Sequence, residues 1–420
     1  MTLRAHTYLT MNVYWFGLAF MWNALHPLVL PALLLHFVPD ALKNTYLGAM
    51  TFVGLVLAMI VQPIAGALSD RTRTRWGRRR PWMVGGTLAS LAILALLAGA
   101  QHLVGLVIGY ILLQVASNTA HGPAQGLIPD LVPAHHRGLV SGFKNLFDMG
   151  GLVVTSLVAG RLVHNGDAAL AFAVVAAVLL VSATTTIVTT RESPTGGEPV
   201  VTERLSDLLN PGLGRYPAYA WLLASRFLIL LGVYVVQSFA QYYIRDWVGA
   251  SDPIVVTGNL MATIGVALTA LVFPAGWLSD RIGRWPLNAA AGALATLGIA
   301  LLVPVRSITG VYAFGGVIGM ATGIFVSVNW ALATDLIPSA EGGKYLGLSN
   351  IATAGAGAAS RLGGPIIDGV NALFPGTFVG YPVAFALAAC ATLVGTLMLW
   401  RVRRAVSDQP LAQIPCEECL

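Results

Sequence analysis

The stretch VQPIAGALSDRTRTRWGRRRP, Val61 to Pro81, places six arginines within ten residues of a largely apolar chain. A basic surface for nucleic acid would explain such a run, and the formal net charge of +6 agrees with it. The composition argues against this explanation. Hydrophobic residues make up 56% and charged residues 10% of the chain, whereas soluble domains have about 45–50% and about 25%. The sequence therefore predicts a membrane protein with the lipid bilayer, and not nucleic acid, around it.

Apolar segments long enough to cross a bilayer run through the whole chain, since a spanning helix takes about 20 residues. The first six cover approximately 11–37, 43–68, 82–100, 104–128, 138–163 and 168–190. The second six cover approximately 218–247, 254–278, 286–304, 309–334, 346–371 and 379–401. We therefore expect an all-α membrane protein with twelve transmembrane helices in two six-helix bundles.

Polar segments divide this chain into parts. Residues 191–217 are rich in Pro and Gly and too hydrophilic to cross a bilayer, so they predict a linker, with a short surface helix near 202–209. The expected domains are an N-terminal bundle at 1–190, a C-terminal bundle at 218–404 and a tail at 405–420. The tail contains the pair Cys416 and Cys419, for which metal binding or redox chemistry is conceivable, although no nearby Cys or His completes a four-ligand site.

Basic residues predict the orientation, because cytoplasmic loops carry an excess of Lys and Arg. With the N-terminus inside, inner segments hold eighteen of the 24 lysines and arginines. Both termini are then expected to be cytoplasmic, in the cell (plasma or inner) membrane. The first span is long enough to stay in the membrane and lacks the features of a cleavable signal.

Two pairs of segments show that the halves are internal repeats, a common basis of transporter folds. Ser69-Asp70-Arg71 matches Ser279-Asp280-Arg281 after the second span of each half. Asp130-Leu131-Val132-Pro133 matches Asp335-Leu336-Ile337-Pro338 after the fourth. Both matches occur in the same order, which chance alone hardly produces.

With these motifs the sequence resembles the major facilitator superfamily, whose loop between spans 2 and 3 has the form G-x-x-x-D-R-x-G-R-R. The finer resemblance is to its sucrose-transporter branch, related to the glycoside-pentoside-hexuronide carriers. Val61-Gln62-Pro63, Ser69-Asp70-Arg71, Gly77 to Pro81, and Asn118 to Leu131 carry it. The resemblance implies transport by alternating access, with rocking of two bundles.

Charged residues at the helix ends form the predicted gate. Asp70 and the arginines of its loop can pair with neighbouring helix ends, including Asp130, and we expect such pairs to latch one half against the other. Part of the arginine run is a topology signal, and its outer members fit contacts with anionic lipid. The predicted gating residues are Asp70, Arg71, Arg78, Arg79, Asp130, Asp280, Arg281 and Arg284.

Amides and aromatic residues dominate the polar content of spans 1, 4, 7 and 10, which line the cavity in the family that the chain resembles. Amides match sugar hydroxyls, and an aromatic face covers the apolar side of a sugar ring. The alternative is that these groups hydrogen-bond neighbouring helices. The predicted substrate-binding residues are Asn23, Gln114, Asn118, His121, Gln125, Gln237, Gln241, Asn329, Trp330 and Arg361.

Charges inside the spans are functional candidates because they are costly there. Asp148 is the predicted proton-coupling site, although Lys144, four residues earlier, permits a plain intrahelical pair. Arg226, Arg361 and Asp368 are further candidates, and a seven-residue spacing puts Arg361 and Asp368 on one helix face. Gln114 and Gln125 stand where plant sucrose carriers have charges, so the roles of those charges do not transfer.

Sequence motifs for catalysis are missing: there is no phosphate-binding loop and no H-E-x-x-H pair. We therefore predict a non-enzyme without cofactor, a monomeric secondary transporter for a sucrose-like glycoside or other small polar solute, driven by protons. No acidic residue occurs between Lys43 and Leu68, which disfavours sodium coupling of the melibiose-carrier type. The alternatives are an exporter of amphipathic compounds and a non-transporting sensor or assembly factor on the same fold.

Overall fold

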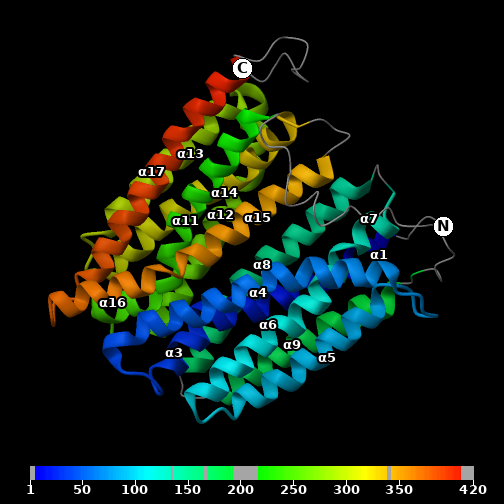
Figure 1. The fold of residues 1–420 in the computed structure, drawn as a ribbon, viewed down its shortest axis with the longest axis horizontal. Coiled ribbons are helices and arrows are strands. Elements are labelled where there is room, and N and C mark those ends of the chain that lie inside the picture. Colours follow the sequence, from blue (N-terminus) through cyan, green and yellow to red (C-terminus); the bar gives the residue numbers. More distant parts are fainter. Residues whose placement is uncertain are drawn as a thin grey trace. The chain divides into compact units, whose positions relative to one another are not determined.

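The computed structural model describes residues 5–133, 136–164, 168–190, 192, 216–337 and 342–407, and the described elements are helical (Figure 1). The N-terminal half contains α1 (Ala5–Thr10), α2 (Val13–Ala24), α3 (Leu30–Leu34), α4 (Lys43–Arg71), α5 (Arg80–Ala98), α6 (Leu103–Gln125), α7 (Leu127–Leu131), α8 (Arg137–His164) and α9 (Ala168–Thr189). The C-terminal half contains α11 (Pro217–Asp246), α12 (Pro253–Ile282), α13 (Arg284–Leu302), α14 (Ile308–Asp335), α15 (Gly342–Ser360), α16 (Gly363–Leu373) and α17 (Gly380–Ser407).

The chain forms two compact units, Met1–Val201 with Thr257–Ala262, and Thr202–Val256 with Thr263–Leu420. Helix α17 continues to Ser407, past the predicted start of the tail at residue 405. The surface helix expected near 202–209 and the two tail cysteines lie outside the described residues.

Each predicted span corresponds to helix in the structure, and the all-helical membrane fold is confirmed. Ten helical segments are long and apolar enough to cross a membrane among the described residues. The other two predicted spans are the fifth of each half: α8, which contains Lys144 and Asp148, and the pair α15 and α16. The repeat thus places its least apolar spans at corresponding positions.

The eleventh span is not the single helix that we predicted over 346–371. It breaks into α15 and α16, with a turn at Arg361 and Leu362. Gly363 and Gly364 follow the turn, and glycine has a low helix propensity. The spacing argument that put Arg361 and Asp368 on one helix face assumed an unbroken helix, which the structure does not have here.

The first span also departs from a regular helix. A π-helical turn, Leu25–Val29, joins α2 to α3 and contains His26 and Pro27. Pro27 has no backbone N–H to donate, which disturbs the hydrogen-bond ladder at this point. Such turns are frequent at functional sites.

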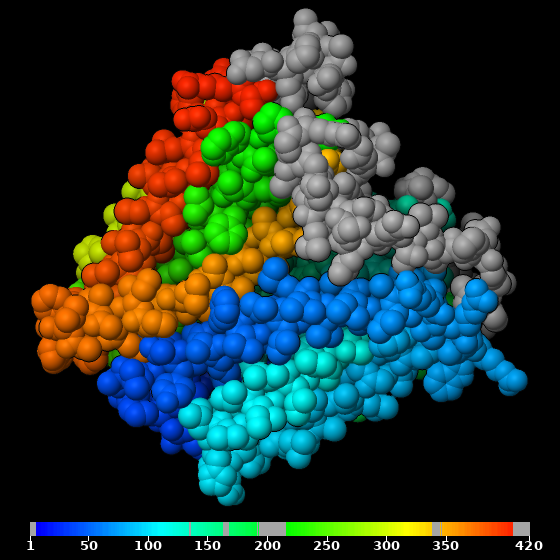
Figure 2. Space-filling model, in the orientation of Figure 1, coloured from blue at the N-terminus to red at the C-terminus, as the bar shows by residue number. Residues whose placement is uncertain are grey.

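Helix packing within the N-terminal unit places α4 along α6 (Figure 2). Helix α2 packs against α8 and α9. Lipid gives little hydrophobic driving force between helices, so close contact of small residues carries the packing. Gly122 of α6 meets the backbone of Gln62 and Gly66 in α4, where a Cβ atom has no room. Large apolar side chains such as Leu96, which is 71% exposed, point outward, as lipid contact permits.

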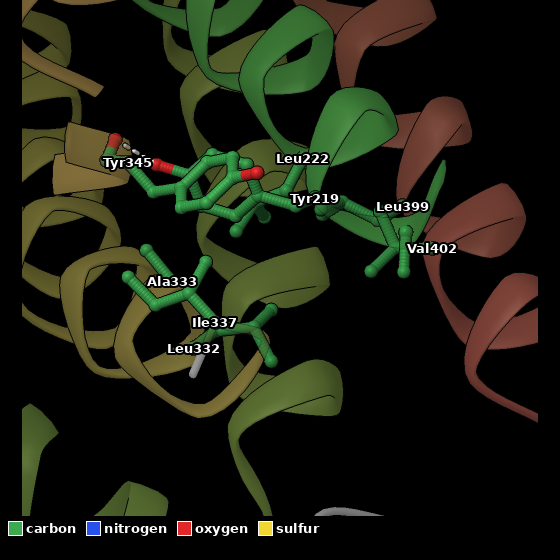
Figure 3. Packing of buried hydrophobic residues seen from close by; sticks show 9 residues of the cluster. Tyr219, Leu222, Leu332, Ala333, Ile337, Tyr345, Leu399 and Val402 are labelled. Atoms are coloured by element: carbon green, nitrogen blue, oxygen red, sulfur yellow. Dashed lines mark hydrogen bonds between the residues drawn. The ribbon is translucent and has the colours of Figure 1, made fainter. Parts of the chain in front are cut away.

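In the C-terminal unit, α11 packs along α17, and α13 contacts both α14 and α17. One buried cluster joins α11, α14 and α17 to Tyr345 of α15 (Figure 3). In it the Tyr219 hydroxyl donates a hydrogen bond to the Tyr345 carbonyl and contacts the Ser349 hydroxyl at 2.8 Å. This packing holds the ends of α11 and α15 together and thereby positions the polar residues further along both helices.

Candidate functional site

The N-terminal charge cluster consists of Asp70, Arg78, Arg79 and Asp130, from the end of α4, the start of α5 and α7. Arg79 contacts Asp70 at 2.5 Å through Nη2 and Asp130 at 2.9 Å through Nε. Arg78 reaches both oxygens of Asp130, at 2.5 and 3.2 Å, the bidentate geometry that makes Arg–carboxylate pairs strong. The contact expected between the arginine loop and Asp130 is therefore present.

Glu192, beyond the end of α9, extends this cluster. Its carboxylate accepts backbone N–H bonds from Arg78, Arg79 and Arg80, at 2.7, 2.9 and 2.9 Å. These groups open α5, where N–H donors lack partners within the helix and a negative charge is favoured. Gly77, just before them, has a φ of +97°, a conformation that glycine adopts without a steric penalty. The carboxylate thus ties the chain after α9 to the start of α5.

The C-terminal charge cluster consists of Asp280, Arg284 and Asp335, at the repeat-equivalent helix ends. Arg284 forms a close ion pair with Asp335 and lies 3.8 Å from Asp280. Gly283 has a φ of +92°, as Gly77 does in the first half. The side chain of Asp280 is 69% exposed, against 30% for Asp70, so the second cluster is the looser one.

Two predicted gating residues lie apart from these clusters. Arg71 is exposed, and Arg281 lies over the Trp277 ring at 3.9 Å. The ion pairs that the structure gives for both clusters join helices of the same half. These pairs brace the helix ends within each half, and the expected latch between the halves stays a prediction.

The N-terminal cation–tryptophan cluster consists of Trp15, His121, Lys144 and Asp148, from α2, α6 and α8. Lys144 lies 4.2 Å from the centre of the Trp15 ring and donates a 3.1 Å hydrogen bond to Asp148. His121 meets Trp15 edge to face, with ring centres 5.1 Å apart. Asp148 is eleven residues into α8, which is about 16 Å at 1.5 Å per residue. The cluster therefore lies well inside the span.

The C-terminal cation–tryptophan cluster consists of Arg226, Asn329, Trp330 and Thr353, from α11, α14 and α15. Arg226 donates to Thr353 Oγ1 at 2.9 Å and to Asn329 Oδ1 at 2.7 Å. Its guanidinium carbon lies 5.9 Å from the centre of the Trp330 ring, and Trp330 as a residue is 38% exposed. The three helices correspond in the repeat to those of the first cluster. Each half thus carries a cation beside a tryptophan on its first, fourth and fifth spans.

A third polar group connects α6 to the π-helical turn. His26 Nε2 lies 3.0 Å from the Tyr110 hydroxyl, and Trp22 stacks on the His26 ring. Gln114 donates to Tyr110 at 2.7 Å and receives a 3.2 Å hydrogen bond from Asn118. The predicted residues Gln114 and Asn118 are both buried in this network, where they satisfy protein groups.

The remaining predicted binding residues stand outside these groups. Asn23 donates to Ala19 O within its own helix, and the exposed Gln125 lies 3.4 Å from His121. Gln241 is buried, whereas Gln237 and Arg361 are half-buried. Thr353 was missed by sequence reasoning, because a threonine in a glycine-rich and alanine-rich helix gives no signal of its own. Lys144 was considered only as an ion-pair partner, and its contact with Trp15 depends on the packing of α8 against α2.

Two bundles related by repeats, with membrane-length helices and polar clusters inside the spans, define a multi-pass membrane transporter. The chain belongs to the Major Facilitator Superfamily, whose family model matches residues 4–361. Transporters, rather than enzymes, make up this family and the relatives that follow.

Sequence relatives include an uncharacterized symporter of Synechocystis, 33% identical over 141 residues, which covers 29% of this chain and 25% of that protein. The sucrose transport protein SUT1 of Oryza sativa is 27% identical over 135 residues, or 27% of this chain and 25% of that protein. The chain thus matches about a quarter of the length of these curated relatives. The inner membrane symporter YicJ of Escherichia coli is 26% identical over 364 residues, or 81% and 74% of the two chains.

Solved structures share the fold at low sequence identity. A bacterial homolog of the human lysosomal transporter Spinster, inward-facing and unoccupied, gives a TM-score of 0.77 at 14% identity, over 97% of this chain and 98% of that one. A D-xylose-proton symporter gives 0.74 at 19% identity, over 95% and 98%.

Proposed function

We propose that this protein is a secondary active transporter of a small polar solute of the glycoside class, coupled to protons and working by alternating access. The observation that carries the proposal is the pair of cation–tryptophan clusters on corresponding helices of the two halves. An aromatic face suits the apolar side of a sugar ring, and cations and amides supply donors to its hydroxyl oxygens. Sucrose transporters and symporters among the relatives support this class of solute.

Asp148 is our candidate for the proton-coupling group. It is half-buried, lies well inside α8, and has Lys144 as its ion-pair partner. Charged groups inside a span are costly and mark ion and substrate paths. If a proton neutralises Asp148, Lys144 loses its counter-ion, so protonation changes the charge beside Trp15. That change would link the proton to the solute.

The two charge clusters are proposed to set the rate of conformational exchange. Each braces the ends of the second, third and fourth spans of one half, so each half can move as a stiff body. We further propose that the clusters face the cytoplasm, together with both termini, that the chain lies in the inner membrane, and that it works as a monomer. The basic residues at the loops support this orientation.

Uptake into proteoliposomes tests the proposal. Labelled sucrose, maltose and a hexose are offered to the purified protein, with and without an inwardly directed proton gradient. We expect one of the glycosides to accumulate only when the gradient is present. Accumulation that is independent of the gradient would contradict proton coupling, and no uptake of any of the three would exclude neutral sugars as the transported solute.

A further inference from the structure

Arg226 is a buried cation whose partners are all neutral. Its side chain is only 4% exposed. Thr353 and Asn329 accept its hydrogen bonds, and Trp330 lies against its guanidinium. Among the residues that the structure describes, no carboxylate lies within ion-pair distance of it. A buried charge is normally paired, because its desolvation costs several kcal/mol.

The cation beside a tryptophan in the first half has a carboxylate partner. Lys144 lies against Trp15 as Arg226 does against Trp330, but Lys144 also has Asp148 at 3.1 Å. The described part of the C-terminal cluster supplies no such anion. Each half therefore holds a cation near a tryptophan, supplied by α8 and α2 in the first half and by α11 and α14 in the second, but a carboxylate partner is described only in the first.

Hydrogen-bond donors remain unused at this place. Arg226 Nε donates to Thr353 and Nη1 donates to Asn329, whereas Nη2 donates to no described residue. Asn329 is 0% exposed, and its Nδ2 atom is buried without a partner. Because Oδ1 of the same amide accepts from Arg226, Nδ2 is held beside the guanidinium. An unpaired positive charge thus stands next to a second unsatisfied donor.

We infer that the transported solute carries a carboxylate, which binds to Arg226 Nη2 and Asn329 Nδ2. Two donors suit the two oxygens of a carboxylate, and hydrogen bonds to a charged group are about twice as strong as neutral ones. The exposed ring of Trp330 covers the carbon skeleton next to the carboxylate. This inference rests on the proposed function and narrows its solute to a polar organic acid.

Two methyl glycosides that differ at one carbon test the inference. Methyl β-D-glucuronide carries a carboxylate where methyl β-D-glucoside carries a hydroxymethyl group. Binding of each is measured calorimetrically with the purified full chain. We expect the glucuronide to bind about tenfold more tightly, a ratio of the size that a charge-assisted hydrogen bond gives. R226Q should remove this preference by lowering the affinity for the glucuronide more than the affinity for the glucoside, and R226K should keep part of the preference.

R306Q is the matched control. Arg306 lies over Trp247 at 3.7 Å and is exposed, so the variant removes another arginine from a tryptophan in the same half. It should leave the preference unchanged. Thermal unfolding of each variant shows whether it is folded. If R226Q fails to fold, N329D serves as the second variant, since it keeps the acceptor for Arg226 but replaces the Nδ2 donor by a negative charge, and it should also lower glucuronide affinity.

The outcomes separate this inference from the proposed function. Equal binding of the two glycosides by the wild-type chain overturns the inference and leaves the glycoside transporter standing. If neither binds, acetate and inorganic phosphate are tested as stabilisers against heat. If acetate stabilises the wild-type chain but not R226Q, the carboxylate site is supported and the glycoside is excluded as the solute. If only phosphate stabilises the chain, or neither ion does, the carboxylate site is overturned.

Discussion

The two halves of this transporter place the same kind of cluster on corresponding helices but balance its charge differently. In the first half, the ammonium of Lys144 on Trp15 is paired with Asp148. In the second, the guanidinium of Arg226 near Trp330 is held by the neutral Asn329 and Thr353. The same fold thus holds two different sets of groups. The first half contains a carboxylate, Asp148, that can take up a proton, and the second contains Arg226, a cation with an unused hydrogen-bond donor.

The charge clusters at the helix ends also differ between the halves: the N-terminal cluster has more ion-pair partners than the C-terminal one. Two arginines hold Asp130 in the first half, and Glu192 reinforces the start of α5. The second half has Arg284 alone between Asp280 and Asp335, with Asp280 largely exposed. Breaking an exposed ion pair costs little, whereas removing one partner of a buried or networked pair costs more, because the other charge stays buried without a partner. The first bundle should therefore depend more strongly on its cluster.

The largest effect is expected from a change of Asp148, the carboxylate that only the N-terminal cation–tryptophan cluster contains. Asp148→Asn should abolish uphill accumulation, which one pH unit would otherwise drive to about tenfold, while exchange of solute down its own gradient continues. Uptake and counterflow in proteoliposomes measure the two processes. Asp40→Asn is the control, because Asp40 also pairs with a lysine at 3.1 Å but lies just before α4, outside the middle of a span. If the Asp148 variant still accumulates solute, the Lys144–Asp148 pair has only a structural role, and the proposed functional difference between the halves is wrong.

Next in size is the difference between the charge clusters. Asp70→Asn should slow solute exchange about tenfold or more, since Arg79 then loses a 2.5 Å charged partner. Asp280→Asn should slow it less, because its contact with Arg284 is long and exposed. Exchange rates and solute affinity are measured for both variants. Equal slowing, or a loss of affinity at normal rates, contradicts the assignment of these residues to conformational exchange.

A smaller effect is expected on stability from Glu192, which has no described counterpart in the second half. Glu192→Gln removes the charge from three backbone N–H bonds and should lower the free energy of unfolding by about 1–2 kcal/mol. The midpoint of thermal unfolding in detergent measures it. Ser307→Ala, which removes the side-chain cap of α14, sets the scale of an ordinary cap at about 1 kcal/mol. An unchanged midpoint for the Glu192 variant would show that this carboxylate adds no stability.

The smallest expected effect concerns sodium. Replacing sodium by choline should leave uptake unchanged, because the second span has no acidic residue between Lys43 and Leu68 to bind the ion. Initial uptake rates in the two salts, at equal ionic strength, provide the measurement. A steep sodium requirement would transfer the coupling role from Asp148 to a cation site elsewhere in the chain.

Local sequence signals predicted the helices and the charge clusters well. Span positions follow from the length of apolar segments, and α4 and α8 begin within one residue of their predicted starts. The motif around Asp70 and its repeat at Asp280 pointed to the correct neighbours, since the loop between spans 2 and 3 is short. The eleventh span was harder: its glycines around Arg361 and Leu362 did not lower the apolar signal, so the break between α15 and α16 passed unnoticed.

The sequence by itself determined the number, order and approximate bounds of the spans, the repeat, and the arginine loop that pairs with Asp130. These depend on residues near one another in the chain, through apolar length and loop charge. Only the tertiary structure decided that Lys144 lies on Trp15, that Arg226 has neutral partners, that Thr353 joins it, and that Glu192 holds the start of α5. The physical reason is that partners of a buried side chain depend on how each helix is rotated and packed against its neighbours, which hydropathy along a single helix does not specify.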